Sequence, residues 1–171
     1  MINRRYGSLE GLTDSERRPL RPIGSSAREV AARTGRLLST LRATPGVRVC
    51  AGFRIAAGHQ PIGFAVIAGT QIVLVESVAW PRGTYSTAPD GRVLCDGIYI
   101  GQSVRPLVTA VRRLRRTRTH RNWVSAVIVV HPYGPGPVAL PETAPAALTW
   151  LRPGDAAEHI GRFLRCAPAD G

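Results

Sequence analysis

The first regular element that the hydrophobic pattern predicts is a helix starting near Ser26. Ser26 and Glu29 have the spacing of a capping box, in which both side chains bond to free amides at a helix start. Apolar or small residues then recur at helical spacing, at Ala27, Val30, Ala31, Thr34, Leu37, Leu38 and Leu41. Thr44-Pro45-Gly46 supplies the stop signal, so we expect the helix to end before it.

Three strands are predicted after this helix. Residues 47–55 alternate between apolar and polar side chains, as a strand with one buried face does. Residues 62–68 and 72–80 are almost continuously apolar and flank Gly69-Thr70, which favours a hairpin of central strands covered on both faces. A weaker pattern over residues 84–94, around Pro89-Asp90-Gly91, predicts a peripheral hairpin.

A second helix is predicted from about Ser103 to Thr117, because its apolar residues form one stripe. Residues 123–130 then read as another buried strand, residues 148–151 as a short strand, and Asp155 as the cap of a last helix. This order predicts the α/β class, with a mixed central sheet flanked by helices.

Length and composition indicate one domain that is able to bury a core. The chain has 171 residues, of which 44% are hydrophobic. Residues 1–24 are rich in arginine and proline, so we expect a flexible basic arm there, disordered or touching nucleic acid, followed by a single domain over 25–171. The apolar run 61–80 is long enough to span a membrane, but its β-branched residues and Glu76 favour a buried hairpin and no membrane contact.

Three widely spaced cysteines without CxxC spacing predict neither a disulfide framework nor a zinc site. The N-terminus has no apolar core of a secretory signal. A reducing, cytoplasmic location is the expectation that follows.

The charge balance favours a polyanionic partner, with DNA or RNA as the first expectation. There are 23 basic residues, all arginine, against 11 acidic ones, for a formal charge of +12. Six arginines lie within ten residues around the end of the second predicted helix: Arg112, Arg113, Arg115, Arg116, Arg118 and Arg121. They fit either phosphate binding by guanidinium forks or a solvated face suited to the negative end of the helix dipole.

The segments IGFAVIAGTQIVLVESVAWPRGTY, GRVLCDG and VSAVIVVH, with Glu29 in the early helix and Gln102 opening the second, resemble the nuclease-related domain (NERD) family. This family is a branch of the PD-(D/E)XK nuclease-like superfamily, and the resemblance covers roughly Ser25 to Leu164. It implies a restriction-endonuclease-like core with the order α-β-β-β-α-β. It also implies that Glu29 and Glu76 match two metal-site carboxylates.

Two positions depart from the family pattern. Gly63 stands where an aspartate is expected and Val78 stands where the motif lysine is expected. Phosphodiester hydrolysis needs Mg²⁺ to orient water and a cation to stabilise developing charge. Arg82 or Arg105 could supply charge in place of the lysine, but arginine cannot act as a base. We therefore expect a catalytically degenerate domain that binds nucleic acid without sequence preference.

Two alternatives remain open. The chain could be a protein-interaction or regulatory subunit of a larger complex or a homo-oligomer. It could also be a metal-dependent nuclease with rearranged ligands, in which Glu29 and Glu76 hold Mg²⁺ or Mn²⁺; otherwise no cofactor is expected. Glu29 also fits a plain capping role, whereas Glu76 in an apolar strand needs a partner, a metal or exposure to offset its desolvation.

Overall fold

The computed structural model describes residues 5–14, 18–116 and 123–165. The α-helices of these residues are α1 (Ala27–Leu37), α2 (Arg105–Arg116) and α3 (Ala156–Arg165), with 3₁₀ turns at Leu38–Ala43 and Pro153–Asp155. The strands are β1 (Arg5–Gly7), β2 (Val47–Phe53), β3 (Ile62–Ala68), β4 (Gln71–Trp80), β5 (Gly83–Thr87), β6 (Arg92–Cys95), β7 (Ile98–Ser103), β8 (Trp123–Pro132), β9 (Val138–Ala139) and β10 (Leu148–Leu151).

A six-stranded mixed sheet organises the molecule, with the strand order β1-β2-β3-β4-β8-β10. Strands β2, β3 and β4 form an antiparallel meander, while β8 runs parallel to β4 and β10 runs parallel to β8. Antiparallel strands need only short turns, whereas the parallel β4–β8 pair needs a long crossover, which contains α2. The predicted α/β class and the helix-flanked mixed sheet are confirmed.

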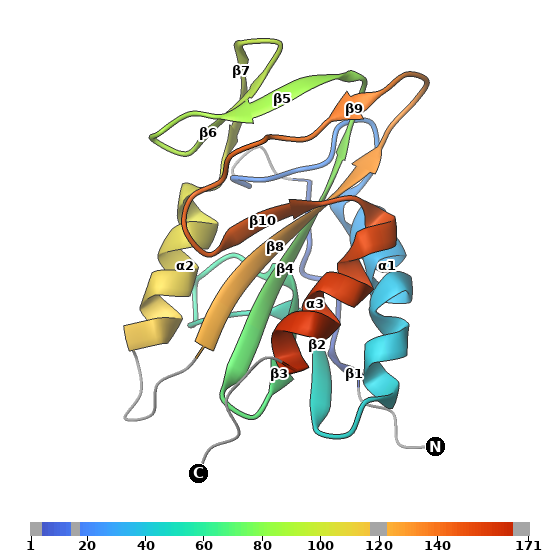
Figure 1. Cartoon of the computed structure of the whole chain (residues 1–171), viewed down its shortest axis with the longest axis vertical. Coiled ribbons are helices and arrows are strands. Elements are labelled where there is room, and N and C mark those ends of the chain that lie inside the picture. The colour runs from blue at the N-terminus through green and yellow to red at the C-terminus, as the bar shows by residue number, and fades with distance from the viewer. Residues whose placement is uncertain (1–4, 15–17, 117–122, 166–171) are drawn as a thin grey trace.

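The large sheet is covered by α2 on one face and by α1 and α3 on the other (Figure 1). Side chains alternate between the two faces of a strand. In β4, Leu74 and Val78 therefore pack in the core beneath α2, and Val73 and Val75 pack in the core beneath α1 and α3. This alternation explains the continuous apolar run of β4, because both of its faces are buried.

A second sheet, with the order β7-β6-β5-β9, lies at one end of the large sheet (Figure 1). The peripheral hairpin predicted over residues 84–94 corresponds to β5 and β6. Trp80 stacks on Tyr85 with 4.1 Å between ring centroids, which joins the end of β4 to this second sheet. Gln102, expected to open the second helix, lies instead in β7, where it is buried.

The expectation of a flexible arm over residues 1–24 is wrong for the part of it that the structure describes. β1 pairs in parallel with β2, and Leu9, Leu12 and Leu20 are buried. Two backbone hydrogen bonds of 2.7 Å also hold the segment against the rest of the protein. The Ile23 N–H donates to the carbonyl of Ala79, and the Ser103 N–H donates to the carbonyl of Pro19. A few widely spaced leucines produce no periodicity, so the pattern did not reveal that this segment packs.

The apolar run that has the length of a membrane span forms the β3–β4 hairpin, as predicted. Among the described helices, none is long and apolar enough to cross a membrane.

Candidate functional site around Glu76 and the arginine face of α2

Glu76 lies within β4, on the face that α2 covers, and is only 7% exposed. Burial raises the pKa of its carboxyl to about 7, although Arg18 and the backbone amides of Gly63 and Ser77 pull it down. The nearest charge is Arg18, whose Nη2 donates to Glu76 Oε2 at 3.3 Å. Glu76 is therefore a buried carboxylate with a partner, one of the situations expected for it from the sequence.

Arg18 comes from the N-terminal segment and is itself almost fully buried, with 5% of its side chain exposed. Its Nε donates to the carbonyl of Leu20 at 3.4 Å and its Nη2 donates to Glu76. Its Nη1 is buried and has no hydrogen-bond partner among the described residues. A buried guanidinium with one unsatisfied nitrogen is costly, because the lost hydration is not replaced.

Glu76 and Arg18 line a cavity of about 410 Å³. Its walls come from four parts of the chain, namely the N-terminal segment 18–20, the loop and strand start between residues 55 and 62, Glu76 of β4, and the first turns of α2. Apart from Arg18, Glu76, His59 and Gln60, the lining consists of apolar residues and one glycine. The ion pair therefore faces a largely apolar space.

Gly63 lies next to Glu76 on the neighbouring strand β3, and Val78 lies two residues beyond Glu76 on β4. A Cβ atom added to Gly63 would lie 3.9 Å from Glu76 Oε2 and 3.1 Å from the carbonyl oxygen of Val75. Val78 is fully buried in the core beneath α2. These positions, where the resemblance expects an acid and a lysine, offer neither a ligand nor a cation, and Arg18 provides the positive charge instead.

Glu29 is exposed and closes the capping box of α1. Its Oε2 accepts from the Ser26 N–H at 3.2 Å, and its own N–H donates to Ser26 Oγ at 3.2 Å. These hydrogen bonds lower the pKa of the Glu29 carboxyl. Since α1 packs on the sheet face opposite to α2, the structure does not bring Glu29 together with Glu76, and Glu29 does not line the cavity.

The described residues contain no group of three or more histidine, cysteine, aspartate or glutamate side chains that could hold a metal ion. A site at Glu76 would have one carboxylate, already hydrogen-bonded to a guanidinium. Mg²⁺ takes carboxylates, waters and substrate phosphates in near-octahedral geometry, so a cation here would compete with Arg18 for Glu76.

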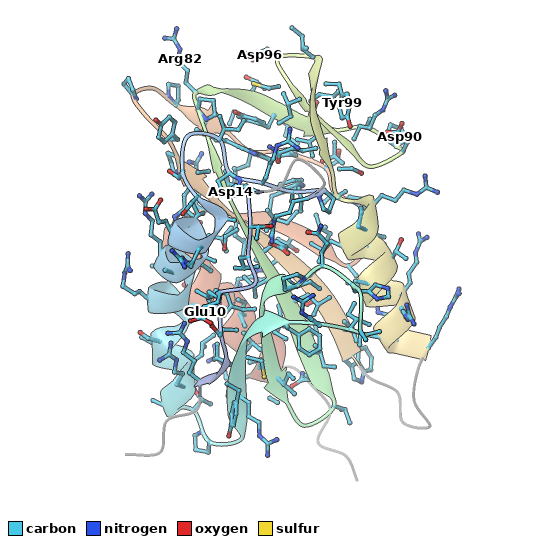
Figure 2. All side chains as sticks on the ribbon, turned by 180° about the vertical axis from the view of Figure 1, so that it is seen from behind. Glu10, Asp14, Arg82, Asp90, Asp96 and Tyr99 are labelled. Carbon is cyan, nitrogen blue, oxygen red and sulfur yellow. The ribbon has the colours of Figure 1, made fainter. Side chains whose placement is uncertain are left out.

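The exposed side of α2 is strongly basic. Arg112, Arg113 and Arg116 are exposed and surround a shallow surface hollow together with Thr109. The helix has no acidic residue, and the chain has none between Asp96 and Glu142. In Figure 2, Asp90 and Asp96 lie beyond the N-terminal end of α2, in the small sheet. Asp90 pairs with Arg92 and shares a shallow surface hollow with Arg105 and Arg112.

The remaining arginines of the predicted cluster differ in their surroundings. Arg115 donates from Nε and Nη2 to the carbonyl oxygen of Val124, at 3.0 and 2.6 Å, so it anchors α2 to β8. Arg118 and Arg121 lie outside the described residues. Arg113 reaches towards the cavity, because its Nη1 lies 3.0 Å from Nε2 of His59, which lines that cavity.

Neither arginine that the sequence suggested as a replacement for the lysine lines the cavity that holds Glu76. Arg82 points into solvent at the far end of the small sheet (Figure 2). Arg105 is exposed at the start of α2. Arg18 was missed, because a carboxylate in an apolar strand signals the need for a partner but not which of 23 basic residues supplies it.

A second buried polar group lies on the opposite face of the sheet. Ser77 Oγ donates to Thr34 Oγ1 at 2.7 Å, and Thr34 Oγ1 lies 2.8 Å from Nε2 of His131. Because the threonine proton is then available for His131, the neutral imidazole accepts it at Nε2. Burial lowers the pKa of His131 to about 4, and Arg33 adds to the effect. These three side chains satisfy one another and join α1 to β4 and β8.

Comparison of the chain with protein-family models, with curated proteins and with solved structures found no match. Functional inference for this protein therefore starts from its own residues.

Proposed function

We propose that this protein is a catalytically degenerate nuclease-like domain that binds DNA or RNA without sequence preference through the arginines of α2. The observed order of α1, β2, β3, β4, α2 and β8 supports a restriction-endonuclease-like core, since it follows the α-β-β-β-α-β order of that fold. The segments β1, β5 to β7, β9, β10 and α3 are additions to that core in this proposal.

The pairing of Glu76 with Arg18 supports the loss of catalysis. A guanidinium does not lose its proton, so Arg18 cannot act as a general base, and it competes with any metal for the carboxylate. Gly63 supplies no second ligand beside Glu76. A hydrolytic site needs a fixed metal, an oriented water and an open coordination position, and these residues provide only one acidic ligand.

The observation that carries the binding proposal is an arginine stripe along α2. Arg105, Thr109, Arg112 and Arg116 follow one another at spacings of four, three and four residues, which places them on one side of a helix. All four are exposed. Without carboxylates on the helix to neutralise them, closely spaced guanidinium groups repel one another, and phosphates relieve that repulsion. Phosphate contacts position a nucleic acid but carry no sequence information.

A charge-matched pair of triple variants tests this proposal. R105A/R112A/R116A removes the three exposed arginines of the α2 stripe, and R28A/R33A/R36A removes three exposed arginines from α1 on the opposite face of the sheet. Binding to a random-sequence duplex is measured by fluorescence anisotropy between about 50 and 200 mM salt. Loss of three phosphate contacts should make the log–log salt slope shallower by about 2 to 3 in the α2 variant.

The α1 variant should change that slope by less than about 1, because it alters only the long-range field. Equal effects of the two triple variants would mean that net charge, not the α2 surface, drives binding. Absence of salt-sensitive binding to DNA and to RNA by the wild-type protein would instead favour the protein-interaction alternative.

Cleavage is tested separately with plasmid and single-stranded substrates in Mg²⁺ or Mn²⁺. We expect no turnover. Robust cleavage that disappears in E76A would overturn the catalytic part of the proposal and revive the nuclease with rearranged ligands.

A further inference from the structure

Arg18, which lines the cavity beside Glu76, keeps one nitrogen without a hydrogen-bond partner among the described residues. Two of the three Arg18 nitrogens are engaged, by Leu20 and by Glu76, while Nη1 is buried without a partner. Buried polar groups in folded proteins are rarely unsatisfied, and each exception calls for a water, an ion or a ligand. Nη1 carries two N–H groups, which suit one carboxylate oxygen and a water.

The rest of the cavity favours an apolar partner. Leu20, Ile55, Ile62, Leu107 and Ala110 contribute aliphatic side chains to its lining. Its volume of about 410 Å³ lies within the range of roughly 300–1,000 Å³ that is common for small-molecule sites. Such sites combine mostly apolar walls with a few placed polar groups, which is the composition seen here.

We propose that this cavity binds a small organic acid, a monocarboxylate with an apolar body, and that a small turn of the Arg18 side chain brings the buried Nη1 onto the ligand carboxylate. The aliphatic walls cover the apolar body of the ligand, and Glu76 lies beside its carboxylate. This binding activity is separate from nucleic-acid binding and does not require it.

Other ligand classes fit these residues less well. Inorganic phosphate would bring up to two charges and several acceptor oxygens against walls that offer one unused guanidinium nitrogen. A free cation would meet the positive charge of Arg18 beside Glu76, the only carboxylate that the described residues place in the lining. A neutral apolar molecule would leave Nη1 unsatisfied.

Glu76 makes the binding of an anion depend on pH. Among the described residues, the charged or titratable groups that share the cavity with Glu76 are Arg18 and His59, and the α2 residues of the lining carry no charge. Arg113 of α2 contacts His59, with its Nη1 3.0 Å from Nε2 of the imidazole. An arriving carboxylate disfavours the ionised form of Glu76, whose pKa is already about 7, so binding takes up a proton at higher pH. Protonated Glu76 can then donate a hydrogen bond to the ligand.

Hexanoate is the probe for calorimetric titration of the full chain, with hexanol and inorganic phosphate as comparison ligands. Hexanoate should bind more tightly than either. Its affinity should fall as the pH rises above about 7, approaching tenfold per pH unit, with proton uptake seen as a dependence of the heat on the buffer. E76Q should remove this pH dependence, whereas H59Q should keep it.

R18Q should weaken hexanoate binding by about 10- to 100-fold, the usual effect of losing a charge-assisted hydrogen bond. Because R18Q leaves Glu76 unpaired, R18Q/E76Q serves as a second variant that removes both charges from the site. A110L keeps the ion pair and fills part of the cavity from α2, so it should also abolish binding while the protein stays folded.

Equal affinity for hexanoate and hexanol would overturn the proposal, and so would tighter binding of phosphate or undiminished hexanoate binding by folded R18Q/E76Q. The α2 variant R105A/R112A/R116A, whose three arginines do not line the cavity, separates this site from the proposed function. It should lose nucleic-acid binding and retain hexanoate binding, so failure of one activity is seen independently of the other.

Discussion

Replacing Glu76 by glutamine should stabilise the protein at about pH 8 and have little effect at about pH 5. Burial raises the pKa of the Glu76 carboxyl from 4.5 to about 7, so the folded protein favours its neutral form. At about 1.4 kcal/mol per pKa unit, this separation corresponds to roughly 3 kcal/mol of lost stability once Glu76 is ionised. Glutamine resembles the neutral carboxyl in size and never ionises, so E76Q should avoid most of this loss.

The sign of the effect follows from the direction of the pKa change. A carboxyl whose pKa is raised on folding contributes its full stability below 4.5, and this contribution is lost as the pH rises through about 7. His131 acts in the opposite sense, since its pKa is lowered to about 4, so its contribution is full above 6.5 and is lost as the pH falls towards 4. The two effects should partly cancel in the wild-type protein and flatten the pH dependence of its stability.

The difference between wild type and E76Q isolates Glu76, because His131 lies on the other sheet face and contributes equally to both proteins. Urea unfolding, followed by tryptophan fluorescence at about pH 5, 6, 7 and 8, gives the free energy of unfolding of each protein. Trp80 and Trp150 are buried, so unfolding changes their surroundings. The difference should grow from under about 1 kcal/mol at pH 5 to roughly 2–3 kcal/mol at pH 8. E142Q, at an exposed glutamate, is the control and should show no such growth.

One result would refute this reasoning. If E76Q were less stable than wild type by a constant amount from pH 5 to 8, Glu76 would be ionised throughout this range. Its attraction to Arg18 would then exceed the cost of burial, and the protonation proposed for ligand binding would not occur.

Three further substitutions test other parts of the structure. R115A should lower the free energy of unfolding by about 1–2 kcal/mol, because the hydrogen bonds of Arg115 to β8 are lost. R116A should change it by less than about 0.5 kcal/mol. Equal effects of the two variants in chemical denaturation would contradict the anchoring role of Arg115. T34V should cost about 2–4 kcal/mol, because it leaves two buried polar side chains unpaired, and T34S should restore most of that stability in the same assay. G52A should loosen the N-terminal segment, because the added Cβ would overlap the Ser8 carbonyl and because Gly52 has a φ of +59°, which disfavours alanine. Unchanged hydrogen exchange across residues 5–14 would disprove this.

Features that depend on neighbours in sequence were predictable. The capping box of Ser26 and Glu29, the hairpin at Gly69 and the apolar stripe of α2 each follow from local spacing, and all three occur in the structure. Hydrophobic periodicity determines which face of a helix or strand is buried, because each element must cover its own apolar side. The exposed arginines of α2 could be anticipated for the same reason.

Features that depend on how distant segments meet were decided by the tertiary structure alone. Arg18 and Glu76 are 58 residues apart, and Thr34 and His131 are 97 residues apart, so no local pattern links them. The sequence shows that a carboxylate in a buried strand must find compensation, but long-range packing selects the partner. An N-terminal segment that looked too polar to pack thus supplies the guanidinium, and it does so because β1, Leu9, Leu12 and Leu20 hold it against the sheet.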